Sequence, residues 1–142
     1  MKTCYFAIFF WILTIGCQSP AAWAGAEPSD ASSTDSVWDK ARLRGVSLRA
    51  IGQEPGWLLE ITTGIEILLV TDYGENRNSY PYAEPRVRQE ERRTEYLLNN
   101  GDLVIEIRDK PCMDSMSGER FSVSVKITTV QRTLEGCGRM LQ

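Results

Sequence analysis

Histidine is absent from the 142-residue sequence, and its absence excludes a large share of enzyme chemistry. Zinc sites built on imidazole and nucleophiles activated by a neighbouring histidine both require this residue. An excess of one charge is also missing, because 16 basic and 19 acidic side chains give a net charge of −3. Nucleic-acid binding needs a clear basic patch. We therefore expect no nucleic-acid partner, no metal and no other cofactor.

Long apolar runs are scarce, and the most prominent one lies at the N-terminus. Lys2 precedes an apolar stretch from Tyr5 to Ile15. This stretch is shorter than the roughly 20 apolar residues that a transmembrane helix needs. It has the length and position of the hydrophobic core of a secretory signal, so residues 1–16 are predicted to be a signal peptide.

The end of this segment offers two cleavage sites. The sequence Leu13-Thr14-Ile15-Gly16-Cys17 resembles a bacterial lipoprotein box, with Thr where Leu is usual. Lipidation of Cys17 would anchor the chain to the membrane, and Gln18 after the cysteine indicates the periplasmic face of the outer membrane. The alternative site, Ala22-Trp23-Ala24, would release a soluble periplasmic protein beginning at Gly25.

The remainder divides into a spacer and one domain. Residues 17–36 are poor in apolar side chains and are predicted to form a lipid-anchored flexible tether. Residues 37–142 suffice for a single domain. The charged segment 86–98 has no apolar stripe and is predicted to be a charged loop or an exposed hairpin arm. Alternating apolar and polar residues predict strands at 46–51 and 121–127, and two runs around Thr62-Thr63-Gly64 predict a hairpin of strands at 57–61 and 65–70. Further strands are predicted at 103–107, after the turn at 99–102, and at 133–137. We expect an all-β domain, a small antiparallel barrel or sandwich.

Two of the four cysteines are predicted to form a disulfide. Cys4 lies in the signal peptide and Cys17 in the lipoprotein box, which leaves Cys112 and Cys137 in the strand-rich region. An exported pair in a small domain is expected to be oxidised, and two thiols are too few ligands for a metal site.

The segment from Gly52 to Trp57 is the first candidate for function. Pro55-Gly56 is typical of a turn, and Trp57 opens the next strand as a core anchor or, alternatively, as a platform for a sugar. Glu54 is interpreted as a cap or surface charge, with general acid catalysis as the alternative.

The loop from Cys112 to Phe121 is the second candidate. Asp114 and Ser117 are expected to hydrogen-bond the backbone of a tight turn, and the alternative is a preorganised polar surface that includes Arg120. Ser115 and Ser117 have no imidazole base, which argues against nucleophilic catalysis. The candidate binding surface therefore comprises Glu54, Trp57, Asp114, Ser117 and Arg120.

Taken together, these motifs resemble a family of uncharacterised bacterial envelope proteins, described as predicted membrane proteins or lipoproteins. The likeness rests on Gly52-x-Glu54-Pro55-x-Trp57, Cys112-x-Asp114-x-Met116-Ser117 and Gly136-Cys137, and spans about residues 45–139. It implies a disulfide-linked periplasmic β domain, sometimes joined to modules of the c-type lysozyme inhibitor kind. The chain departs from the family pattern at Gly56, where an aromatic residue is frequent, and in a charged insertion at 72–95.

A weaker resemblance is to the c-type lysozyme inhibitors themselves. The segment Ser117-Gly118-Glu119-Arg120-Phe121 has the outline of their inserting loop, without their aromatic-rich C-terminal motif. The preferred hypothesis is a non-enzymatic binding or structural module that contacts an envelope protein or peptidoglycan. The alternatives are a lysozyme inhibitor acting through Ser117 and Arg120, and a hydrolase acting on envelope glycan or peptide through Glu54 and Asp114.

Overall fold

The computed structural model describes residues 32–142, so the expected signal peptide, Cys17 and residues 17–31 of the expected tether lie outside the described residues. One helix precedes eleven strands and two short 3-10 turns. The elements are α1 (Ser32–Leu43), β1 (Leu48–Gln53), β2 (Gly56–Thr62), β3 (Glu66–Thr71), η1 (Asp72–Gly74), β4 (Asn76–Pro81), β5 (Arg86–Arg88), β6 (Arg93–Leu98), η2 (Asn99–Gly101), β7 (Leu103–Arg108), β8 (Cys112–Met113), β9 (Arg120–Phe121), β10 (Val123–Thr129) and β11 (Thr133–Met140).

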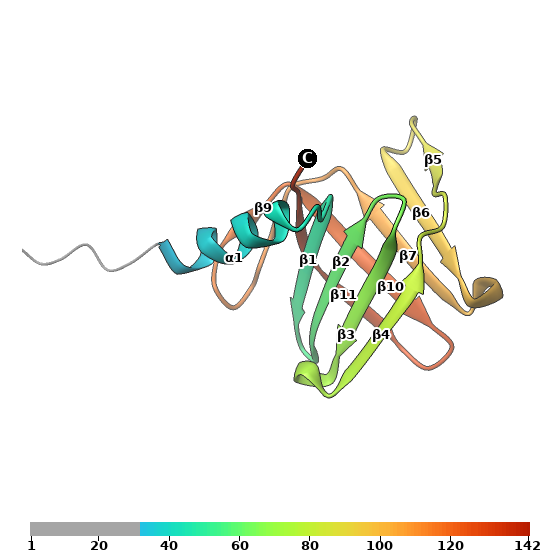
Figure 1. Cartoon of the computed structure of the whole chain (residues 1–142), viewed down its shortest axis with the longest axis horizontal. Coiled ribbons are helices and arrows are strands. Elements are labelled where there is room, and N and C mark those ends of the chain that lie inside the picture. The colour runs from blue at the N-terminus through green and yellow to red at the C-terminus, as the bar shows by residue number, and fades with distance from the viewer. Residues whose placement is uncertain (1–31) are drawn as a thin grey trace, which may run out of the picture.

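Nine of the strands form one antiparallel sheet in the order β4-β3-β2-β1-β11-β10-β7-β6-β5, and β8 pairs with β9 in a separate small hairpin. The sheet curls into a half-barrel (Figure 1), which confirms the prediction of an all-β fold. Strands β4 and β5 are its two edges, and only residues 82–85 connect them along the chain.

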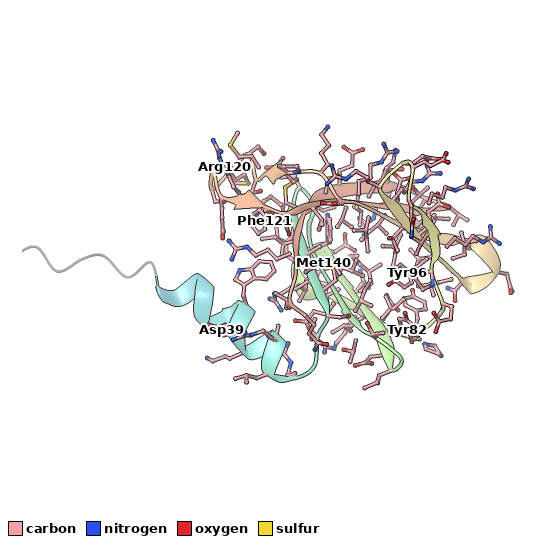
Figure 2. All side chains as sticks on the ribbon, turned by 90° about the horizontal axis from the view of Figure 1, so that it is seen from above. Asp39, Tyr82, Tyr96, Arg120, Phe121 and Met140 are labelled. Atoms are coloured by element: carbon pink, nitrogen blue, oxygen red, sulfur yellow. A yellow bond between two sulfur atoms is a disulfide. The ribbon has the colours of Figure 1, made fainter. Side chains whose placement is uncertain are left out.

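Alternate residues of β1, β2, β3, β6, β7 and β10 point into the curl and form the core, together with Leu134 of β11. This alternation is the period of two that an extended strand imposes. Seen from above, the sheet wraps around an interior filled with side chains (Figure 2). The core consists of Leu48, Ala50, Trp57, Leu59, Ile61, Ile67, Leu69, Tyr96, Leu98, Leu103, Ile105, Ile107, Val123, Val125, Ile127 and Leu134.

Trp57 is the largest side chain of this core and lies across two glycines. Gly52 is its direct partner in the pairing of β1 with β2. A Cβ atom at Gly136 would lie 2.6 Å from Trp57 Cζ2, and one at Gly52 would overlap the indole. Both positions must therefore lack a side chain, because protein interiors leave no room for overlap.

Two side-chain contacts join parts of the curled sheet that are not neighbours in the strand order. Arg132, in the turn between β10 and β11, donates two hydrogen bonds of 2.7 Å to the carboxylate of Asp72, which follows β3. On the other side, the Tyr82 ring lies 6.1 Å from the Tyr96 ring, edge to face, and Figure 2 shows the two side by side.

Helix α1 covers the outer face of β1 and β11 through Trp38, which is buried against Phe121 and Cys137. The guanidinium carbons of Arg49 and Arg139 lie 5.5 and 5.2 Å from the Trp38 ring centroid, within the range of cation–π attraction. Trp38 is thus the main described contact of the helix with the sheet, and the small buried side chain of Ala41 adds to it.

The structure adds elements that the sequence reading did not contain. Helix α1 begins at Ser32, so residues 32–36 of the expected tether are helical, and β4 lies within the expected charged insertion. Segment 86–98 forms the β5–β6 hairpin rather than a charged loop, but the expectation of an exposed arm is only partly right, because Tyr96 and Leu98 of β6 are buried in the core. From Ser32 onward, no helix has the length and apolar character needed to cross a membrane.

Candidate functional site

A groove with a volume of about 1000 Å³ lies on the outer face of the sheet. Strands β7, β10 and β11 form its floor, the loop that starts at Cys112 forms one wall, and the β1–β2 turn closes one end. We call it the outer groove. It is lined by residues 52–54, Val104, Glu106, Arg108, residues 112–116, residues 124–126, Thr128 and residues 135–137.

The floor of the outer groove carries charges of both signs. Lys126 lies directly opposite Glu106 on β7 and Glu135 on β11. Arg108 Nε donates a 2.6 Å hydrogen bond to Glu106 Oε1. Partial burial raises the pKa of Glu106, but the hydrogen bond from Arg108 and the positive charges of Arg108, Arg93 and Lys126 outweigh it and hold the pKa below its ordinary value. The carboxylate is therefore ionised at neutral pH, and the floor offers paired charges.

The wall is a loop closed by its own hydrogen bonds. Asp114 Oδ2 accepts hydrogen bonds from the backbone N–H of Ser117 at 2.9 Å and from its hydroxyl at 2.6 Å. Both hydrogen bonds lower the pKa of Asp114, and the bond from the hydroxyl has the larger effect. The expectation that Asp114 and Ser117 stabilise a tight turn is confirmed. Met113 and Met116 project outward from this wall with 63% and 67% of their surfaces exposed.

The disulfide fixes the position of this wall. Cys112 and Cys137 are bonded, with their Cα atoms 5.5 Å apart, as the sequence predicts. Since Cys137 belongs to β11 and Cys112 starts the loop, the bond attaches the wall to the floor. The groove is thus built on a rigid base rather than between two free loops.

The structure brings some of the predicted surface residues together and separates others. Glu54 and Asp114 line the same groove from two loops that are distant in sequence. Ser117 directs its hydroxyl to Asp114. Arg120 is exposed on β9, outside the groove, and lies at the periphery of the molecule in Figure 2.

Trp57 requires a correction, because its placement on the binding surface is wrong. The side chain is only 5% exposed and points into the core, on the face of the sheet opposite the groove. Its interpretation as a core anchor is confirmed. The close fit of the indole to Gly52 and Gly136 excludes a sugar platform at this position.

Sequence reasoning missed the residues that form the floor. The polar positions of the floor strands β7, β10 and β11 are occupied by Glu106, Lys126 and Glu135, so the sequence predicts that their side chains point away from the core. Their proximity is not predicted, because it depends on strand order and register. Within residues 32–142, no group of three or more Cys, Asp or Glu side chains is arranged to hold a metal ion.

Comparison of the chain with family models, with curated proteins and with solved structures found no match. The chemistry of the groove must therefore be argued from its own residues.

Proposed function

We propose that the chain is an exported, lipid-anchored envelope protein whose β domain is a non-enzymatic binding module. The signal-like segment and Cys17 support export and anchoring to the periplasmic face of the outer membrane. The observation that carries the binding role is the outer groove. Its floor offers paired charges, its wall carries two exposed methionines, and a disulfide attaches the wall to the floor.

The side chains of the groove favour binding over catalysis. Asp114, the candidate partner of Glu54 in a hydrolase, uses Oδ2 for two hydrogen bonds within its own loop. The lowered pKa of Asp114 rules it out as the general acid, and as the ionised partner of Glu54 it would have to act with an oxygen that already binds Ser117 twice. Methionine is flexible and polarisable, and it suits a surface that adapts to a ligand.

Affinity capture tests this proposal directly. The full mature chain, kept in detergent, is immobilised and exposed to solubilised bacterial envelope, and the bound material is identified by mass spectrometry. We expect one saturable ligand whose binding is lost in the double variant Lys126→Gln/Glu135→Gln. This variant removes one charge of each sign from the floor and leaves the net charge unchanged.

The matched control is Arg86→Gln/Glu90→Gln, which also removes one positive and one negative charge, at exposed positions of the β5–β6 hairpin outside the groove. Equal capture by both double variants would refute the groove as the binding site. Added c-type lysozyme provides a separate arm. Retention of lysozyme that depends on Arg120 would replace the groove by the alternative inhibitor function.

A further inference from the structure

Two turns of the sheet have the same backbone geometry and different sequences. In η1, Asp72, Tyr73 and Gly74 have φ values of 54°, 56° and 102°. In η2, the corresponding residues of Asn99-Asn100-Gly101 have φ values of 50°, 57° and 99°. The residue after each turn donates its N–H to the carbonyl of the first turn residue.

The central residue of such a turn is usually Asn or Gly, because these residues tolerate the left-handed region. Asn100 follows this preference, whereas Tyr73 violates it with a bulky side chain. Backbone strain of this kind persists where the surrounding structure enforces it and is enriched at functional sites. The backbone geometry of the turn therefore gives no reason for a tyrosine at position 73.

The surroundings hold the Tyr73 ring in one place. A Cβ atom at Gly56 would lie 2.6 Å from Tyr73 Cδ1 and 2.8 Å from Cε1, so the ring rests against the bare Cα of this glycine. The hydroxyl donates a 3.4 Å hydrogen bond to the carbonyl of Gln53. Asp72, beside it, is fixed by Arg132. Nevertheless 78% of the Tyr73 surface is exposed.

The ring adjoins the outer groove through Gln53, which lines the groove and accepts the hydrogen bond of the Tyr73 hydroxyl. Gly56 is the direct partner of Gln53 in the pairing of β1 with β2, so both present the same face of the sheet. Gln53 and Glu54 line the groove. The Tyr73 ring, packed on the Gly56 side, continues this surface past the β1–β2 turn.

We propose that Tyr73 is a stacking platform for a sugar ring of a glycan that continues into the outer groove. The proposal rests on the proposed binding function and names its ligand class. The electron-rich face of an aromatic ring attracts the slightly positive C–H groups on one face of a pyranose. The exposed face of Tyr73 offers this contact with its position already fixed, so little entropy is lost on binding.

The groove favours a glycan over a peptide. An extended peptide binds by adding a strand to a free sheet edge. The floor strands β7, β10 and β11 are interior strands, with a neighbour on each side. The floor therefore offers side-chain carboxylate, ammonium and hydroxyl groups, from Glu106, Lys126 and Ser124 among others, which match the hydroxyl groups of a sugar chain.

The test measures binding of the full mature chain to cellohexaose, maltohexaose and hexa-N-acetylchitohexaose by calorimetry. We expect at least one to bind, and Tyr73→Asn to weaken its binding at least about tenfold. Because Asn gives η1 the sequence preference of η2, this variant should have a Tm equal to or above that of the wild type. Tyr73→Phe keeps the ring and should bind as the wild type does.

The possible outcomes separate the two proposals. If none of the three oligosaccharides binds, or if Tyr73→Asn binds as tightly as the wild type, the platform is refuted. Loss of binding in Lys126→Gln/Glu135→Gln but not in Tyr73→Asn would retain the groove and reject the platform. Loss in Tyr73→Asn alone would retain the platform and reject the groove. Capture of a protein ligand with no affinity for sugars would also overturn the inference.

Discussion

The two faces of strand β11 separate residues that serve the fold from residues left for binding. Gly136 points inward, where the Trp57 indole occupies the space of its missing side chain. The next residue, Cys137, points outward and binds Cys112. Glu135 also points outward but lies in the open groove. The inner face has no spare room, whereas the outer face is partly covered and partly open.

This difference changes the meaning of the motifs that resemble envelope proteins. Gly52, Trp57 and Gly136 form one packing unit, and Cys112 and Asp114 position a loop. Most of these motif residues thus explain why the domain has its shape. The charged side chains of the groove floor, Glu106, Lys126 and Glu135, for which we propose a binding role, lie outside the motifs.

The largest expected effect comes from the inner face. Trp57→Ala should lower the free energy of unfolding by about 3–5 kcal/mol, because it removes a buried aromatic ring and leaves a cavity over two glycines. This is a large part of the roughly 5–15 kcal/mol typical of a domain. Urea unfolding followed by circular dichroism measures it. A loss below about 1 kcal/mol would show that the indole does not anchor the core.

A somewhat smaller effect is expected from the covered part of the outer face. Cys112→Ser opens the disulfide, which joins residues 25 apart in sequence, and should cost about 3.5 kcal/mol in the chain-entropy model. Thermal unfolding with and without reductant measures this. Reductant should lower the Tm of the wild type to that of the variant and leave the variant unchanged. A Tm of the wild type that is insensitive to complete reduction would contradict the prediction.

Acid should destabilise the domain in part through Asp114. The pKa of this carboxyl is lowered in the folded state from the ordinary 3.8. The unfolded chain therefore takes up the proton first, and the contribution of Asp114 is present above about pH 4 and is lost as the pH falls further. Asp114→Asn should flatten the decline of Tm between pH 5 and pH 3, whereas Glu90→Gln, on the exposed hairpin, should not. Identical pH profiles for the wild type and Asp114→Asn would refute this.

The smallest effect is expected on the open part of the outer face. Lys126→Gln should change the free energy of unfolding by no more than about 0.5 kcal/mol, because its ion pair with Glu135 is exposed and 3.9 Å long. Urea unfolding of the variant beside the wild type measures it. A loss of several kcal/mol would mean that the groove floor serves the fold, and the distinction between the two faces would fail.

The strands that could be predicted are those with one buried and one exposed face. Two apolar runs around Thr62-Thr63-Gly64 predict the hairpin of β2 and β3, and alternation predicts β1 and β10. Strand β4 was not predicted, because an edge strand with the sequence NRNSYP has little buried surface to mark it. Helix α1 was not predicted because, among its described side chains from residue 37 onward, Trp38 and Ala41 are the two that are buried, within a polar sequence.

The candidate site could be predicted only as separate pieces. The hydrogen bonds of Asp114 and Ser117 follow from local turn chemistry. The meeting of Glu54 with this loop does not, because β1 and β11 pair at opposite ends of the domain sequence. The sequence does not predict Tyr73 as a site residue, because its left-handed conformation and its contact with Gly56 exist only in the folded chain.

The short link at residues 82–85 has a consequence for how the chain folds. Among the nine strands of the main sheet, each strand pairs with the next one along the chain, with the exception of β4 and β5, which do not pair. The sheet is instead completed by the pairing of its first strand, β1, with its last, β11. Pairings between strands that are adjacent along the chain form quickly. We therefore expect β1–β4 and the strands from β5 onward to assemble as two halves, which then join through β1 and β11. Residues 82–85 can span only about 18 Å, so they hold the halves close together until this last, slowest pairing is made.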